Sequence, residues 1–162
     1  MDSQTFRDVL AQFVTGITVV ISGIPGAIRG MTVNSFTSVS LHPPLVLFCA
    51  DNRADTFSAV MSSHRFTVSI LSEQQEAVSQ RFALIGPQDT LYSTLNCGMG
   101  LGGIPYLKDS LAYLDCAVDN VVQAGDHHII VGLVEHLELL NPGRPLMYFQ
   151  SQYYHPGTLP PD

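Results

Sequence analysis

The order of sequence patterns predicts a mainly β protein, a closed antiparallel barrel with short helices between its strands. Short runs rich in β-branched residues recur along the chain and are separated by turn residues. The stretches with helical spacing are few and do not alternate with the strands as a parallel βαβ sheet would require. The length of 162 residues suits one domain, which we place at residues 1–155, followed by a C-terminal tail at 156–162.

The first half of the chain begins with apolar residues at helical spacing, namely Phe6, Val9, Leu10 and Phe13. Asp2 or Ser3 is expected to cap this helix, and Gly16 to supply its left-handed end. Strands are expected at 17–22, 27–33 and 45–49, the first two joined by a turn at 23–26. Asp55 is then expected to cap a short helix that turns three apolar residues inward, Phe57, Val60 and Met61.

In the second half, a strand at 66–71 leads into Ser72 to Gln75, which has the form of a capping box. The helix that it opens should bury one face, made by Ala77, Val78 and Phe82. Residues 85–105 hold five glycines, so we expect a long loop that acts as a lid or an exchange arm. Strands follow at 111–122 and 127–140, joined by a turn at 124–126, and a last short strand at 145–149.

Charge and composition exclude several classes of partner. The net charge is −7 with one lysine, so neither nucleic acid nor an anionic membrane is expected to bind. The content of charged residues is 13%, against 46% hydrophobic residues, which favours a covered subunit interface. No apolar run approaches the ~20 residues of a membrane span, and the N-terminus lacks the features of a signal peptide. We therefore expect a cytoplasmic protein.

The three cysteines, Cys49, Cys97 and Cys116, are widely spaced and form no CxxC pair. They are predicted to be free thiols that form neither disulfides nor a zinc site, and Cys49 and Cys116 are expected to be buried in apolar strands. The remaining histidines are scattered around the adjacent pair His127 and His128, so no metal site is expected. Strand alternation allows only one histidine of this pair to face a pocket, and the alternative is that both are solvated at a turn.

The segment from Thr32 to Ser40 is the strongest functional signal, because it packs five Ser/Thr residues and an Asn into nine positions. Such side chains, with neighbouring backbone amides, suit the polar edge of a flat heterocycle such as a flavin. The alternative is an edge strand whose hydroxyl groups face water. From Cys49 to Thr56 a strand runs into a helix start, where free amides and Arg53 could bind a phosphate. The alternative there is that Asp55 itself serves as the anion.

Three segments together resemble the short-chain flavin reductases, which are flavin reductase-like FMN-binding split-barrel proteins. They are FRDVLAQFVTGITVVI from residue 6, GMTVNSFTSVSLHPPLVL from residue 30 and GDHHIIVGLV from residue 125. The resemblance implies a six-stranded antiparallel Greek-key split β-barrel that forms a homodimer. It also implies hydride transfer from NADH or NADPH to FMN or FAD, with reduced flavin passed to a partner flavin-dependent monooxygenase.

The resemblance assigns roles to particular positions. It places the flavin ring edge against Thr32, Val33, Asn34 and Ser35. Thr37 and Ser38 would reach the ribityl chain or phosphate, and Ala50, Asp51, Asn52 and Thr56 would complete the phosphate end. Phe82 would lie near the flavin, and His127 would seat the nicotinamide as the one residue assigned to catalysis.

Two positions depart from the family pattern. Asp55 stands where family members often have a serine, and no Lys or Arg occurs from Phe82 to Leu107. Losing a charge-assisted hydrogen bond costs about 1.5–3 kcal/mol, so we expect weak, exchangeable flavin or another phosphate anchor, Arg53 or Arg29. The sequence leaves open NADH against NADPH, FMN against FAD, and flavin as prosthetic group against substrate. It also leaves open a flavin-binding electron carrier or a ligand-binding split-barrel protein without reductase turnover.

Overall fold

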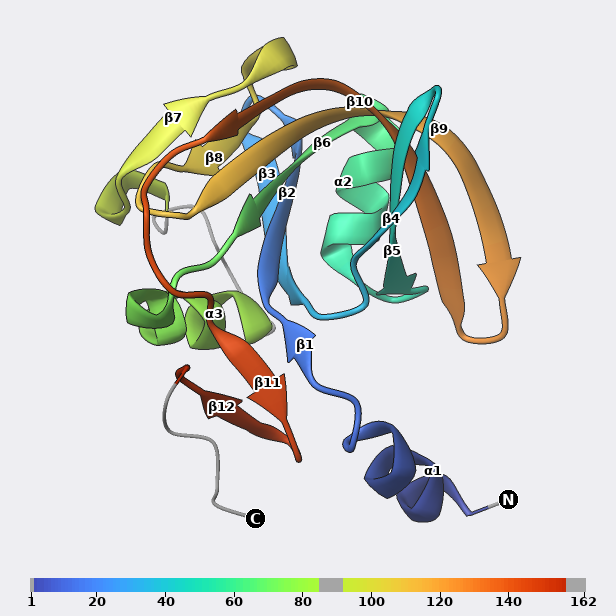
Figure 1. Ribbon diagram of the computed structural model, residues 1–162. Helices are drawn as coiled ribbons and strands as arrows, with labels where there is room; N and C mark the ends of the chain where they lie inside the picture. Colours follow the sequence, from blue (N-terminus) through green and yellow to red (C-terminus); the bar gives the residue numbers. More distant parts are fainter. Residues whose placement is uncertain (1, 85–91, 157–162) are drawn as a thin grey trace.

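The computed structural model describes residues 2–84 and 92–156, and its centre is a seven-stranded antiparallel sheet. The strand order is β3-β2-β6-β9-β10-β5-β4, and the sheet curls around its own core as a barrel (Figure 1). The strands are β2 Thr18–Ile24, β3 Ala27–Val33, β4 Thr37–Leu41, β5 Pro44–Asp51, β6 Arg65–Ile70, β9 Ala112–Ala124 and β10 His127–Leu139.

The prediction of a mainly β antiparallel barrel is confirmed, but the main sheet has seven strands where six were expected. The additional strand is β4, in the polar segment, which pairs with β5 at the edge of the sheet. The hairpins β2–β3 and β9–β10 are in the predicted places, because each combines β-branched runs with a tight turn. Near the C-terminus, β11 Met147–Phe149 pairs with β1 Thr15–Gly16 and with a strand that was not predicted, β12 Gln152–Tyr154.

The core lies on both faces of the sheet. Side chains alternate along β2, so Val20 joins the cluster inside the barrel while Val19 and Ile21 join a second cluster outside it. Inside, the rings of Phe48 and Phe66 meet edge to face with centroids 5.1 Å apart. The outer cluster is covered by α3 and by the C-terminal segment, so a strand such as β2 is buried along nearly its whole length.

Helix α1, Ser3–Leu10, lies away from the barrel in Figure 1 and buries none of its side chains. Asp2 caps it as predicted, accepting a hydrogen bond from the Thr5 amide at 3.0 Å. The prediction for its end is wrong: the helix stops at Leu10, and Gly16 belongs to β1. The apolar positions of the predicted helix are exposed, up to 75% for Phe13.

Helix α2, Asp55–Ser63, begins one residue earlier than predicted, because Asp55 was expected to precede the helix as its cap. Ala54 is its N-cap and Asp55 its first residue, so the expectation that Asp55 caps the helix is wrong. Val60 is buried and Phe57 packs on the core as expected, but Met61 is 40% exposed because it lies on the outer side of the helix.

Helix α3, Glu76–Ala83, follows the one-turn 3-10 helix η1, Glu73–Gln75. The capping box between Ser72 and Gln75 is present as predicted, and it opens this pair of helices. Phe82 is buried and Val78 half-buried on the inner face. Ala77 is exposed, contrary to expectation, and Ser79 takes the inner position instead.

The predicted loop at 85–105 is only partly a loop. Residues 85–91 lie outside the described residues, as do 157–162 of the predicted tail. From Tyr92 onward the chain forms short ordered elements, η2 Tyr92–Thr94, β7 Cys97–Met99, η3 Leu101–Gly103 and β8 Pro105–Leu107. β7 and β8 pair with each other as a two-stranded sheet. Glycine here allows close packing: a side chain on Gly100 would collide with the carboxylate of Asp115.

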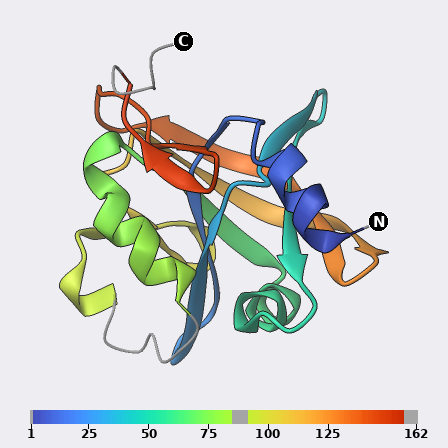
Figure 2. The same cartoon turned by 90° about the horizontal axis from the view of Figure 1, so that it is seen from below.

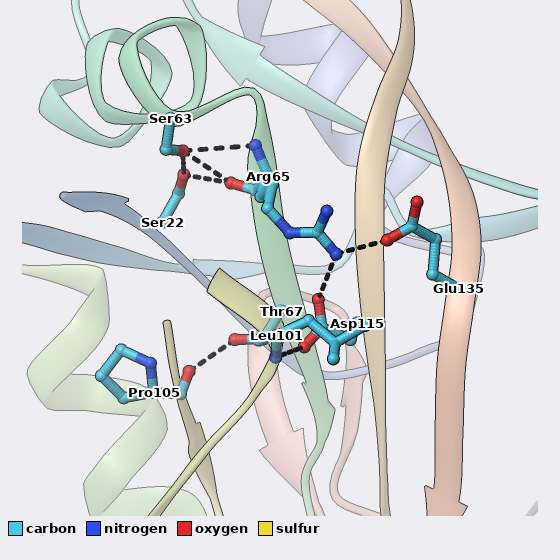
Figure 3. A network of polar contacts seen from close by, with 8 residues as sticks. All are labelled: Ser22, Ser63, Arg65, Thr67, Leu101, Pro105, Asp115 and Glu135. Atoms are coloured by element: carbon cyan, nitrogen blue, oxygen red, sulfur yellow. Dashed lines mark hydrogen bonds and ion pairs between the residues drawn. The ribbon is translucent and has the colours of Figure 1, made fainter. Parts of the chain in front are cut away.

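A polar network fastens this segment to the barrel (Figure 3). Asp115 is buried on β9 and accepts a hydrogen bond from the Leu101 amide. Arg65 on β6 contacts Asp115 at 3.4 Å and Glu135 on β10 at 2.5 Å. The Thr67 hydroxyl donates to the Pro105 carbonyl at 2.6 Å. Burial raises the pKa of Asp115, opposed by the Leu101 amide and by Arg65.

Candidate functional site

A cleft of about 490 Å³ opens at one edge of the barrel. At this edge, α2 and α3 flank the β2–β3 hairpin, as Figure 2 shows. The walls of the cleft come from three segments that are distant in sequence: β3, the end of β5 with the start of α2, and the end of α3. The lining residues are Arg29, Gly30, Met31, Thr32, Asp51, Arg53, Ala54, Asp55, Thr56, Phe82, Ala83 and Leu84. A volume of this size is typical of a small-molecule or cofactor site.

The β3 wall is held against α3 by two close contacts. The Thr32 hydroxyl donates to the Ser79 carbonyl at 2.6 Å. Gly30 is buried, and a β-carbon at this position would lie 2.7 Å from the Phe82 ring and 3.0 Å from the Tyr92 hydroxyl oxygen. The glycine therefore allows the aromatic ring to approach the strand. Because the Phe82 ring is buried here, this wall is apolar at its base.

The opposite wall carries the charged groups and the start of α2. Arg53 is bound to Asp51 by its backbone amide at 2.8 Å, by Nε at 3.2 Å and by Nη2 at 3.0 Å. These hydrogen bonds lower the pKa of Asp51 to about 2, so its carboxylate is charged near neutral pH. The Arg53 side chain is 90% exposed, which leaves room for a ligand to contact the guanidinium from the solvent side.

The start of α2 adds backbone donors to this wall. Its N-cap, Ala54, has no side chain that could bond the first-turn amides, and Thr56 is buried at the floor of the cleft. The Phe57 amide already donates to the Ala54 carbonyl, which leaves the amides of Asp55 and Thr56. These amides and the positive end of the helix dipole favour an anion at this position. Asp55 lies in the same turn and opposes that preference with its own negative charge.

The two adjacent histidines have different environments. His128 is half-buried and stacks on Phe57 with ring centroids 4.1 Å apart at 14°. Within the described residues its Nδ1 is buried and has no hydrogen-bond partner. His127 is exposed, contacts Asp126 at 2.8 Å and is paired across the sheet with Asp51, which lines the cleft. His127 therefore stands beside the cleft, although it is not part of its lining.

The structure brings five of the predicted site residues to the cleft: Thr32, Asp51, Arg53, Thr56 and Phe82. The others do not line it. Val33 and Ala50 turn their side chains into the core, so they could offer a ligand only backbone groups. Ser35 is bound to the Cys49 backbone, which ties the polar segment to β5, and the Asn52 amide donates to the Asp126 carbonyl. Asn34, Thr37 and Ser38 are exposed along the neighbouring edge.

The sequence argument missed Gly30, Met31, Ala83 and Leu84 as lining residues. The signal for Gly30 was a lone glycine inside a β-branched run, a pattern that marks close approach of the backbone to another group. No group of three or more His, Cys, Asp or Glu residues in the described ranges is placed to hold a metal ion. In the same ranges, no helix is long and apolar enough to cross a membrane.

An antiparallel barrel whose cleft is aromatic at one wall and charged at the other suits an aromatic, anionic ligand such as a nucleotide. Comparison with known proteins identifies the family. The model of the flavin reductase like domain matches residues 10–157, so the chain belongs to this family.

Relatives along nearly the whole chain carry related names. The chain is 40% identical over 154 residues to the reductase component of 4-hydroxyphenylacetate 3-monooxygenase from Thermus thermophilus, covering 93% of this chain and 94% of the relative. It is 38% identical over 156 residues to the reductase subunit HsaB of a flavin-dependent monooxygenase from Mycobacterium tuberculosis, covering 94% and 82%.

A solved structure supports the same comparison. The NADH:FAD oxidoreductase SgcE6 of Streptomyces globisporus, in complex with NAD and FAD fragments, matches with a TM-score of 0.88 and 32% identity. The match covers 97% of this chain and 95% of that chain.

Proposed function

We propose that this protein is an NAD(P)H-dependent flavin reductase that reduces FMN or FAD and supplies it to a separate monooxygenase. The observation that carries the proposal is the cleft of about 490 Å³, in which a buried aromatic wall faces a helix N-terminus and Arg53, with Arg29 on the β3 side. A flavin has a flat apolar ring system at one end and a phosphate at the other, and it needs this pairing of surfaces. The family membership and the relatives' names support the same reaction.

The residues present fit a flavin nucleotide. The buried Phe82 ring and the glycine opposite it leave a smooth apolar surface for the ring system. Thr56 and the first-turn amides of α2 would hold the phosphate, with Arg53 and Arg29 as the nearby positive charges. Exposed groups of the polar segment, from Asn34 to Ser38, would reach the polar edge of the ring from the neighbouring strand end. This arrangement requires no metal ion.

When bound, the flavin accepts the hydride, and the protein contributes position and electrostatics. The cleft wall of Gly30 and Phe82 fixes the plane of the ring, which sets the distance to the donor. The side-chain amide of Asn34, among the exposed groups of the polar segment, would donate to the ring edge, where negative charge develops. The Asp51–Arg53 pair neutralises its own charges, so that the carboxylate does not repel the reduced ligand as strongly as an unpaired one would.

The nicotinamide would lie over the exposed side of the flavin, beside His127. This residue follows directly from the β9–β10 turn and is opposite Asp51 in the sheet. The contact between His127 Nδ1 and the Asp126 carboxylate orients the imidazole ring, and it leaves Nε2 available to a ligand. We assign His127 to binding and orienting the donor. No proton transfer by a side chain is needed in the hydride step.

The assembly and the location are part of the proposal. Phe6, Val9, Leu10 and Phe13 are exposed together on and just after α1, an apolar surface that a second copy of the chain would cover. The homodimer expected from the resemblance explains why a helix with an apolar face lies away from its own barrel (Figure 1). The three free thiols suit the reducing cytoplasm.

The direct test is turnover with purified protein, NADH or NADPH, and a titration of FMN and FAD, followed by loss of the near-ultraviolet absorbance of the reduced nicotinamide. Saturable, flavin-dependent oxidation supports the reductase. Flavin binding without turnover would replace it with the electron-carrier alternative.

A further inference from the structure

A second hollow, of about 300 Å³, continues from the flavin cleft along the groove between α2 and the end of the β2–β3 hairpin. Figure 2 shows the helix and the hairpin side by side at this edge. Arg29 and Asp55 line both hollows, so the two meet at this pair of residues. A ligand whose phosphate lies at the start of α2 would therefore find further space beyond Asp55.

The chemistry of this groove suits a flat ring with a sugar attached. Its apolar contacts come from Ile24, Ala27 and Ala59, whose small or branched side chains leave a shallow slot. Ser58 and Ser62 place hydroxyl groups along the helix side, and the Ser62 hydroxyl already donates to the Ser58 carbonyl, which leaves its lone pairs to accept. Hydroxyl groups and small apolar residues together match a purine and its ribose.

The charge at the junction distinguishes the two flavin nucleotides. FMN ends in a phosphate monoester, whose charge at pH 7 is about −1.5 to −2. Placed at the start of α2, this group would lie beside the Asp55 carboxylate and be repelled. FAD instead carries one negative charge on each of two esterified phosphates. It continues into a ribose whose hydroxyls can donate to a carboxylate, as acidic residues do in dinucleotide sites.

We propose that the groove between α2 and the β2–β3 hairpin is an adenosine subsite, and that Asp55 and this groove select FAD over FMN. The inference rests on the proposed function, because the flavin ring must lie in the adjoining cleft. Arg29, at the junction, would contact the diphosphate. Asp55 would accept hydrogen bonds from the ribose, and the adenine would lie against Ala27 and Ala59.

The first test compares the Kd values of FAD and FMN, measured by quenching of flavin fluorescence, in wild type and in Asp55→Ser. Wild type is expected to bind FAD at least fivefold more tightly than FMN. Asp55→Ser should tighten FMN and weaken FAD, so the ratio of the two Kd values falls toward one. A ratio that stays at the wild-type value in Asp55→Ser would overturn the role of Asp55.

The second test blocks the groove itself. Ser58→Phe would fill the slot from the exposed side of α2, and it should weaken FAD at least fivefold while FMN binding stays within twofold. Met61→Phe is the matched control, because Met61 is exposed on the same helix and does not line the groove. It should change neither Kd. Equal loss of both flavins in Ser58→Phe would overturn the subsite.

Turnover separates this inference from the proposed function. If NADH is oxidised with FMN as efficiently as with FAD, the subsite is wrong and the reductase stands. If Ser58→Phe raises the KM for NADH and leaves the FAD to FMN ratio unchanged, the groove takes the adenosine of the donor and the inference is overturned. If neither flavin binds or supports turnover, the proposed function fails and the inference with it.

Discussion

Gly30 and Phe82 pack closely in the wall of the cleft: a β-carbon on Gly30 would lie 2.7 Å from the Phe82 ring. The strand and the helix can approach this closely only because one partner has no side chain. The same contact shapes the surface on which the flavin ring is proposed to lie. The geometry of the site therefore depends on a residue with no chemistry of its own.

Replacing Gly30 with alanine should push the Phe82 ring into the cleft. We expect a loss of about 1–3 kcal/mol in stability, as for other overpacked sites, and weaker flavin binding. Chemical denaturation and flavin fluorescence measure the two effects. Gly16→Ala is the control, since a β-carbon there meets nothing within 4 Å. Unchanged flavin affinity in Gly30→Ala would remove the ring from this wall.

Arg53→Ala tests the phosphate end of the cleft. The variant loses a guanidinium and leaves Asp51 without its partner, so both changes disfavour an anionic ligand. The loss of a charge-assisted hydrogen bond of about 1.5–3 kcal/mol should raise the Kd for flavin roughly tenfold or more. Arg7→Ala, on exposed α1, is the control, because it removes the same charge away from the cleft and should leave the Kd for flavin unchanged. Equal affinities in both variants would mean that another residue anchors the phosphate.

His127 and His128 give a matched pair for the donor site. His127→Ala should raise the KM for NADH or NADPH by roughly 2- to 10-fold, the value of one lost hydrogen bond, with a smaller effect on the KM for flavin. His128→Ala removes the stack on Phe57 and should lower stability instead. Steady-state kinetics with each substrate varied in turn make the comparison. The reverse pattern would place the nicotinamide elsewhere.

Asp115→Asn should alter the pH dependence of stability. Burial raises the pKa of Asp115 above the value of about 3.9 in the unfolded chain, so folding takes up a proton in the range between the two. The contribution of Asp115 to the wild-type free energy of unfolding therefore decreases as pH rises across that range. The variant lacks this contribution. Denaturation of both proteins from pH 4 to 8 gives the difference curve, and a flat difference would mean that the pKa is not raised.

The variant also separates the hydrogen bonds of the network. Asparagine can still accept from the Leu101 amide, but its NH2 group replaces the oxygen that accepts from Arg65, so a donor would face a donor. Because Arg65 keeps Glu135, we expect a loss of about 1–3 kcal/mol near neutral pH, less than for an unpaired buried charge. Flavin affinity should change little, since none of these residues lines the cleft.

Phe13→Glu tests the proposed homodimer. Phe13 is the most exposed of the apolar side chains near α1, and a carboxylate there could not be buried in an interface without a large desolvation cost. Sedimentation at micromolar concentration should show a dimer for wild type and a shift toward monomer for the variant. Leu101→Glu, the same change on exposed η3 far from α1 in Figure 1, should stay dimeric. A wild-type monomer would contradict the proposal directly.

The sequence was a good guide wherever local chemistry decides the structure. The β2–β3 and β9–β10 hairpins and the capping box of Ser72 and Gln75 were predicted because turn residues and caps act over a few positions. The strands β7 and β8 were not, because three-residue strands have no periodicity. Distant groups such as Asp115 and Thr67 hold these strands in place. The glycines of this segment predict a flexible loop, but Gly98 and Gly100 allow close packing instead.

The site was predicted in part for a similar reason. The family resemblance assigns roles to Thr32, Asp51, Thr56 and Phe82, and the reading of the helix start adds Arg53. The fold brings all five to one cleft. The groove beyond Asp55 could not be predicted, since it exists only where α2 packs beside the hairpin. Helix α1 shows a third limit: its spacing predicts an apolar face but not that the face lies open to solvent in the single chain.

The most direct test of the central claim is anaerobic mixing of the flavin-loaded protein with NADH, followed by the visible absorbance of the flavin. The account predicts that the absorbance bleaches rapidly in wild type, and that Gly30→Ala, at equal total flavin, bleaches a smaller fraction because less flavin is bound in the cleft. Bound flavin that remains oxidised in the presence of saturating NADH and NADPH would contradict it.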